Sequence, residues 1–164
     1  RCLAMSTRPR ISFNERGECN ACSWAEKKKK ISWNKREIEL KDLLDKHRSK
    51  NGEFDCLVPV SGGKDGSYVA YNLKHKFGMN PLCLTVTPPL PTNLGEQNLR
   101  NFVESGYSHI SVNPPFEAMR KMNKKGFIEM GFPYYGWLTA ILSVPVRIAY
   151  QFNIGITFFL SLSL

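Results

Sequence analysis

The segment Ser61-Gly62-Gly63-Lys64-Asp65-Gly66-Ser67 has the residue types of a loop that binds a phosphate group. It follows an apolar run from Phe54 to Val60 and precedes a helix-like run from Tyr68 to Phe77, which predicts the order strand, loop, helix. Adjacent glycines let the backbone approach an anion, and the first helical amides offer it unpaired donors. The spacing fits neither the Walker loop nor the dinucleotide-binding glycine motif. A plain glycine turn is the alternative.

Three cysteines near the start of the chain have the spacing of metal ligands. Cys19-Asn20-Ala21-Cys22 is a Cys-x-x-Cys knuckle, and sixteen residues separate Cys2 from Cys19. This interval is typical of a zinc ribbon, in which structural zinc has four ligands. We therefore expect Cys2, Cys19 and Cys22 to belong to a partial ribbon whose remaining cysteine would precede Cys2. A free or redox-active thiol pair is the alternative. Cys56 and Cys83 lie in apolar runs and are expected to be buried.

The elements that must position these residues follow from the hydrophobic pattern. A charged helix from Trp33 to Ser49 stops at Asn51-Gly52, which divides the chain into a first domain at 1–52 and a second at 53–164. Strands and helices then alternate, which predicts an α/β fold with a parallel sheet covered on both faces and the ligand at the carboxyl ends of its strands. The predicted strands are 54–60, 82–86, 110–112 and 154–164, and the predicted helices are 65–77, 95–105 and 116–130.

Composition limits the class of protein. The chain of 164 residues has a formal net charge of +9, but the basic segment from Lys27 to Lys50 contains interspersed acids. A solvated helical face explains this segment better than nucleic-acid binding. Residues 1–16 do not resemble a signal peptide, and the apolar end is too short to span a bilayer. Five cysteines form no even disulfide set, so we expect a protein of the reducing cytoplasm without a membrane partner.

Several segments resemble the N-acetyl sugar amidotransferases, a family of the ATP-pyrophosphatase superfamily that includes the pseudaminic acid amidotransferase. The family serves lipopolysaccharide and other surface-polysaccharide pathways and flagellar glycan synthesis. The similarity extends to about Asn153, and its most specific parts are the first and third of the segments that follow. They are Thr7-Arg8-Pro9-Arg10-Ile11, Cys19-Asn20-Ala21-Cys22, the run from Asp55 to Asp65, and Gly78-Met79-Asn80-Pro81-Leu82.

The resemblance implies a Rossmann-like domain of the adenine nucleotide alpha hydrolase type and an ATP-dependent amidotransferase. ATP would adenylate the N-acetyl oxygen of a sugar, expected to be nucleotide-linked, and ammonia from a separate glutaminase subunit would displace AMP to leave an acetamidino group. ATP, Mg²⁺ and Zn²⁺ are the expected cofactors. Gly62 and Gly63 would bind pyrophosphate oxygens, Lys64 would offset their charge and Asp65 would contact magnesium, which makes Lys64 and Asp65 the expected catalytic residues. Ser61 and Ser67 could donate hydroxyls. Capping of the helix is the alternative role for Asp65.

Three departures from the family pattern count against activity. Gly66 stands where the family has Ser, Phe132 stands where Asp is expected, and the sequence after Asn153 becomes an unrelated apolar tail. We therefore expect this chain, as a truncated member, to bind nucleotide weakly and to be inactive. Two other classes remain open, a tRNA-modifying ATP pyrophosphatase and a non-catalytic zinc-ribbon interaction module. His47, His75 and His109 form no recognisable metal or triad arrangement, and Tyr134, Tyr135 and Trp137 fit a sugar platform or the core.

Overall fold

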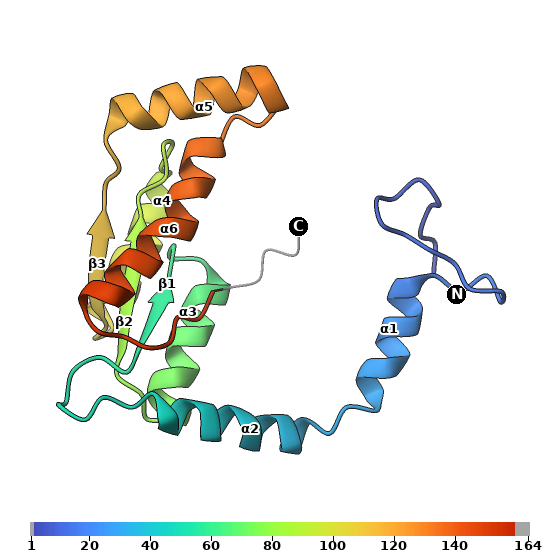
Figure 1. The fold of residues 1–164 in the computed structure, drawn as a ribbon, viewed down its shortest axis with the longest axis horizontal. Coiled ribbons are helices and arrows are strands. Elements are labelled where there is room, and N and C mark those ends of the chain that lie inside the picture. Colours follow the sequence, from blue (N-terminus) through green and yellow to red (C-terminus); the bar gives the residue numbers. More distant parts are fainter. Residues whose placement is uncertain (1, 160–164) are drawn as a thin grey trace. The chain divides into compact units, whose positions relative to one another are not determined.

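A computed structural model describes residues 2–159, and the chain divides between Asp42 and Leu43 into two compact units (Figure 1). The division falls inside helix α2 (Trp33–Lys46), earlier than the boundary that we expected at residues 52 and 53. Leu44 is almost fully buried, with 1% of its surface exposed, so the last turns of α2 belong to the second unit. The helix itself still ends before Asn51-Gly52, so the stop signal marks the end of the helix and not the boundary between the units.

The first unit is built around a short hairpin and a helix. Asn14 accepts hydrogen bonds from backbone amides of the turn that follows it, through its side-chain oxygen and through its backbone oxygen. Gly17 in this turn has a φ of +71°. The turn brings Phe13 and Cys19 into an antiparallel bridge. Cys19 then caps helix α1 (Asn20–Lys29), which was not among the predicted elements. Three lysines in its last turn stabilise the negative end of the helix dipole.

The second unit contains the predicted parallel sheet, in the order β1-β2-β3. The central strand β2 is buried along its whole length, as expected for a sheet that is covered on both faces. The predicted alternation of strands and helices is confirmed, although the helix after β1 ends in a π-helical turn. The elements are β1 (Cys56–Pro59), α3 (Lys64–Tyr71), η1 (Asn72–Lys76), β2 (Pro81–Val86), α4 (Asn93–Glu104), β3 (Ser108–Val112), α5 (Phe116–Met130) and α6 (Tyr135–Gln151).

Helix α6 covers one face of the sheet, where Leu57, Leu82, Leu84 and Val86 form a core with Ala149. The alternate strand residues face the other side, on which α3 contacts β1. A side chain at Gly126 would overlap Tyr135, and one at Gly136 would lie 2.8 Å from Met122 Cβ. These two glycines therefore let α5 and α6 approach closely near the turn that joins them (Figure 1).

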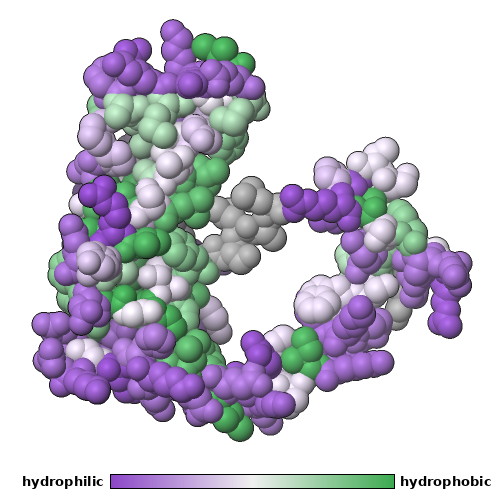
Figure 2. All heavy atoms as spheres, viewed as in Figure 1, coloured by the Kyte–Doolittle hydropathy of each residue, from purple (hydrophilic) through white to green (hydrophobic). Residues whose placement is uncertain are grey.

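Helix α6 also exposes apolar side chains on its outer face. Leu142, Val146 and Tyr150 follow one stripe of the helix and are 52%, 56% and 88% exposed. Figure 2 shows apolar residues gathered along α6 in this unit. Even so, no helix within residues 2–159 is both long and apolar enough to cross a membrane.

The predicted strand at 154–164 is present only as a single parallel bridge between Leu57 and Thr157. The Leu57 amide donates to Ile156 O at 3.0 Å, and the Phe158 amide donates to Leu57 O at 2.9 Å. This segment pairs with the outer edge of β1, so part of that edge is covered. Residues 160–164 lie outside the described part of the chain.

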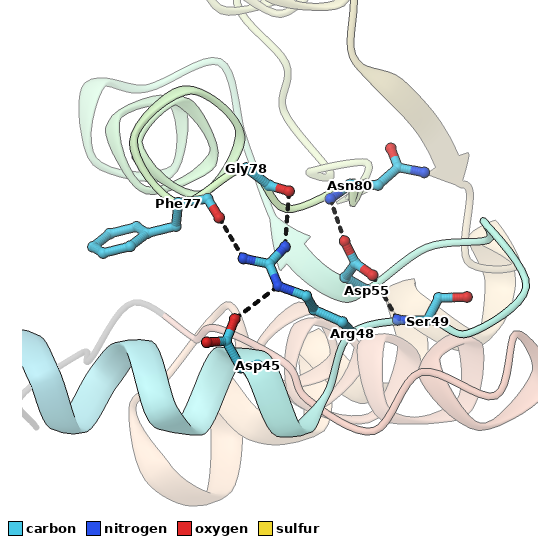
Figure 3. Close-up of polar contacts among 7 residues, drawn as sticks. All are labelled: Asp45, Arg48, Ser49, Asp55, Phe77, Gly78 and Asn80. Carbon is cyan, nitrogen blue, oxygen red and sulfur yellow. Dashed lines mark hydrogen bonds and ion pairs between the residues drawn. The ribbon is translucent and has the colours of Figure 1, made fainter.

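A polar cluster secures the amino ends of β1 and β2 (Figure 3). Asp55 is only 8% exposed, and its carboxylate accepts hydrogen bonds from the backbone amides of Ser49 and Asn80, both at 2.6 Å. The Arg48 guanidinium donates to the carbonyl oxygens of residues 77 and 78 at 2.7 and 2.9 Å. The cluster therefore holds together the segments that lead into β1 and β2.

Candidate functional site

The loop from Ser61 to Ser67 lies at the carboxyl end of β1 and leads directly into α3. Gly63 is the N-cap of the helix, with φ −78° and ψ 162°, and no side chain caps the helix. Within residues 2–159, the backbone amides of residues 62 to 66 donate no hydrogen bond. Four or more unpaired donors at the positive end of a helix dipole form an anion-binding site. The predicted order of strand, glycine loop and helix is therefore present.

The glycines of the loop have different roles. Gly62 has a φ of +76°, and a Cβ there would lie 2.7 Å from the Leu99 backbone nitrogen, so Gly62 allows the loop to contact α4. A Cβ on Gly63 would meet only the Ser61 side chain, with Oγ 3.3 Å away, so no backbone atom crowds this position. A Cβ on Gly66 would lie 3.1 Å from Pro59 O, and this glycine therefore allows α3 to pack on β1. Gly63 is thus the glycine that keeps the anion cradle open.

The charged residues of the loop are available to a ligand. Lys64 and Asp65 occupy the first turn of α3 and are exposed, and neither forms a hydrogen bond or ion pair within the described residues. Asp65 does not cap the helix, which was the alternative role. Ser61 is also exposed, whereas the Ser67 hydroxyl donates to Gly63 O at 2.9 Å. Because that hydrogen is already used, Ser67 does not readily replace a phosphate-binding hydroxyl at position 66.

A hydrogen-bond chain across the sheet supports the base of the loop. Thr85 Oγ1 donates to Val60 O at 2.7 Å, and His109 Nε2 lies 2.8 Å from the same hydroxyl oxygen. Since the threonine hydrogen is already used, His109 must donate from Nε2. Burial lowers the pKa of His109 below its ordinary value of 6.5, which favours a neutral ring. The chain fixes the peptide that precedes Ser61. No spacing in the sequence indicates this chain, because Thr85 lies in β2, His109 in β3 and Val60 directly after β1.

A cavity of about 340 Å³ lies at the carboxyl ends of β2 and β3, the same edge of the sheet as the loop. Phe116 is 76% exposed beside it, and Arg120 contributes a guanidinium that pairs with Glu117 at 2.9 Å. Trp137 is instead part of the core, and its indole donates to Val86 O at 3.3 Å. The cavity is lined by Thr87, Pro88, Pro89, Asn113, Pro114, Phe116, Met119, Arg120 and Asn123.

The structure brings the three predicted metal ligands together. The sulfur atoms of Cys2, Cys19 and Cys22 all lie within 4.8 Å of one another, and Cys2 Sγ is 3.4 Å from Cys19 Sγ. Cys2 is distant from Cys19 and Cys22 in the sequence, and the hairpin before α1 lies between them. Cys19 caps the helix and Cys22 lies in its first turn, so this knuckle begins a helix. Three thiol groups at these distances are a donor set that suits zinc.

Hydrogen bonds within the cluster favour ionisation of one of its thiols, Cys19. The Cys22 backbone amide, with the Cys2 thiol, lowers the pKa of Cys19 to about 7. Hydrogen bonds to Cys2 and Cys19 raise the pKa of Cys22 to about 11. A thiol at a helix N-terminus ionises readily for the same physical reason. The cluster therefore holds one thiolate near neutral pH, and a bound cation would release the protons of the others.

The other two cysteines are buried in the sheet. Neither Cys56 nor Cys83 has measurable exposure, and burial raises the pKa of both thiols to about 12. They remain protonated and belong to the core, as the apolar sequence around them indicated.

Comparisons with known proteins leave the family open. No protein-family model matches the chain. An uncharacterized protein of Methanocaldococcus jannaschii is 34% identical over 55 residues, which is 34% of this chain and 20% of that protein. The structure of NMN synthetase from Francisella tularensis aligns with a TM-score of 0.49 and 17% identity, over 77% of this chain and 53% of that one. The chain spans a fifth and about half of these two proteins, and similarity at this level transfers no activity to it.

Proposed function

We propose that this chain binds Mg·ATP at the loop from Ser61 to Ser67 and uses it to adenylate the oxygen of an N-acetyl sugar, which ammonia then converts to an acetamidino sugar. The observation that supports the proposal is the loop itself. Unpaired amides of residues 62 to 66 surround an open position at Gly63, and the free side chains of Lys64 and Asp65 stand beside it.

The chemistry explains why such a loop is useful. An amide is a poor electrophile, so its oxygen first attacks the α-phosphorus of ATP while the bond to pyrophosphate breaks. Ammonia then adds to the activated carbon, the carbon–oxygen bond breaks, and AMP leaves with that oxygen. Amides of the loop would stabilise the departing pyrophosphate and Lys64 would offset its charge. Asp65 would hold the magnesium ion, which supplies further charge neutralisation.

In this proposal the acceptor would occupy the cavity at the carboxyl ends of β2 and β3. Phe116 offers an exposed ring on which the apolar face of a sugar can stack, while Asn113 and Arg120 offer donors for its hydroxyl groups or a linked phosphate. In this proposal a glutaminase partner supplies ammonia, and zinc bound by Cys2, Cys19 and Cys22 stabilises the first unit. The biosynthesis of a surface polysaccharide or flagellar glycan is the expected setting.

The test follows one oxygen atom. Although the departures from the family pattern predicted an inactive chain, Thr157 pairs with Leu57 of β1 and covers part of the sheet edge. The chain itself is therefore tested, at a concentration above that of the sugar, so that even a single turnover is detectable. It receives Mg·ATP, ammonium and an N-acetyl sugar nucleotide labelled with ¹⁸O in the acetyl group. The proposal predicts sugar-dependent AMP that carries the label. Unlabelled AMP, or no AMP beyond that of the sugar-free control, would reject it. The Lys64→Ala chain is the control for contaminating ATPases and should form less labelled AMP.

A further inference from the structure

The segment Arg8-Pro9-Arg10-Ile11 forms a tight turn with an unusual residue at its third position. The Ile11 amide donates to Arg8 O at 3.2 Å, which closes the turn, and Arg10 has a φ of +61°. Proline at the second position favours such a turn, but a positive φ at the third position is normally taken by Gly or Asn. Arginine here is under backbone strain, and strain of this kind is concentrated at functional sites.

The strained turn is held in place by helix α1. Asn20 Nδ2 donates to Arg10 O at 3.0 Å, and Asn20 is the first residue of the helix. The turn and the helix form an open pocket of about 310 Å³, and Arg8, Arg10, Asn20 and Trp24 are among the residues that line it. Trp24 lies one helical turn after Asn20, and 55% of its surface is exposed. Two arginines and a half-exposed tryptophan therefore line one pocket.

The charge of the first unit suits an anionic ligand. Residues 1–42 contain eleven Lys and Arg and six Asp and Glu, so this quarter of the chain carries a net charge of +5 out of +9. The guanidinium fork binds phosphate oxygens in pairs, and an exposed tryptophan stacks on the face of a nucleobase. Neither the phosphate loop after β1 nor the cysteine cluster uses any of these pocket residues.

We propose that this pocket binds a nucleoside phosphate, with its phosphate on Arg8 and Arg10 and its base stacked on Trp24. The strain at Arg10 is then the cost of directing a guanidinium into the pocket. The proposal concerns the first unit alone and does not depend on the reaction proposed for the second. The same chemistry is offered by a free nucleotide, including the nucleotide part of a sugar nucleotide, and by single-stranded nucleic acid, and the experiment separates these sources.

The experiment measures binding of UMP, uridine and fluorescein-labelled oligouridine to the zinc-loaded chain. Gly63→Val is present throughout, so that the loop after β1 adds no second nucleotide site. We expect UMP to bind more tightly than uridine. Arg10→Gly should weaken UMP binding about tenfold or more, as expected for the loss of a hydrogen bond to a charged group. Arg16→Ala removes the same charge outside the pocket, and it should change affinity less than about twofold, within the range of a screened surface charge.

The stability of Arg10→Gly separates a binding role from a structural one. Glycine accepts positive φ without strain, so the turn should persist in this variant, and a urea midpoint close to that of the parent chain would assign its loss of binding to the missing guanidinium. Arg8→Ala and Trp24→Leu provide independent losses of binding if Arg10→Gly fails to fold. Salt-sensitive oligouridine binding much tighter than UMP would identify a single strand as the ligand, and equal affinity would identify a free nucleotide. UMP affinity that is absent, or unchanged in all three pocket variants, would overturn the proposal.

Discussion

The same substitution at the two adjacent glycines of the loop should lower stability strongly at Gly62 and hardly at all at Gly63. In Gly62→Ala, the positive φ costs about 1–2 kcal/mol. The new Cβ, 2.7 Å from the Leu99 nitrogen, adds about 1–3 kcal/mol because α4 must move. The free energy of unfolding should therefore fall by about 2–5 kcal/mol. Gly63→Ala has an ordinary extended backbone and meets only Ser61 Oγ, so its effect should remain below about 1 kcal/mol.

Urea denaturation followed by circular dichroism measures this difference. With a slope of about 1–3 kcal/mol/M, the midpoint of Gly62→Ala should fall by about 1 M or more, and that of Gly63→Ala should barely change. Both variants add one methyl group within one residue of each other, so each is the control for the other. Similar midpoints for the two variants would show that the loop does not contact α4 as described.

Three further predictions concern Asp55, the cysteine cluster and His109. Asp55→Asn should lower the free energy of unfolding by about 1.5–3 kcal/mol in urea titrations, because an amide has one acceptor oxygen in place of two and keeps only one of the two hydrogen bonds from backbone amides. One zinc ion per chain should bind, and calorimetry should show affinity falling more steeply below about pH 7, where Cys19 also becomes protonated. The pKa of His109 is lower in the folded chain, so the unfolded chain takes up this proton first; stability should fall as pH drops below 6.5, and less so in His109→Gln.

The parallel sheet and its loop could be predicted from local sequence because each element carries its own pattern. The apolar run before Ser61 and the fully apolar β2 indicate buried strands, and Gly63 with Lys64 indicates the start of a helix. The gathering of Cys2 with Cys19 also followed from spacing alone. These features follow from residue types and their spacing along the sequence, which can be read without a structure.

The features that the sequence did not reveal depend on contacts between distant residues. The chain from His109 through Thr85 to Val60 joins three strands, and no spacing rule signals it. Helix α6 packs an apolar surface against the sheet and contains Pro145, and it was not among the predicted helices. The left-handed backbone of Arg10 was hidden because its residue type argues against that conformation.

Calorimetric titration of Mg·ATP into the chain, beside Gly63→Val, tests the central claim most directly. Valine fits the extended backbone at Gly63 but fills the space that a phosphate must enter. If the loop binds ATP, the variant should retain the circular dichroism spectrum of the parent chain and bind ATP at least about tenfold more weakly, a loss of about 1.4 kcal/mol. Equal affinity in a correctly folded Gly63→Val chain, or no binding by the parent chain, would contradict the assignment of this loop as the nucleotide site.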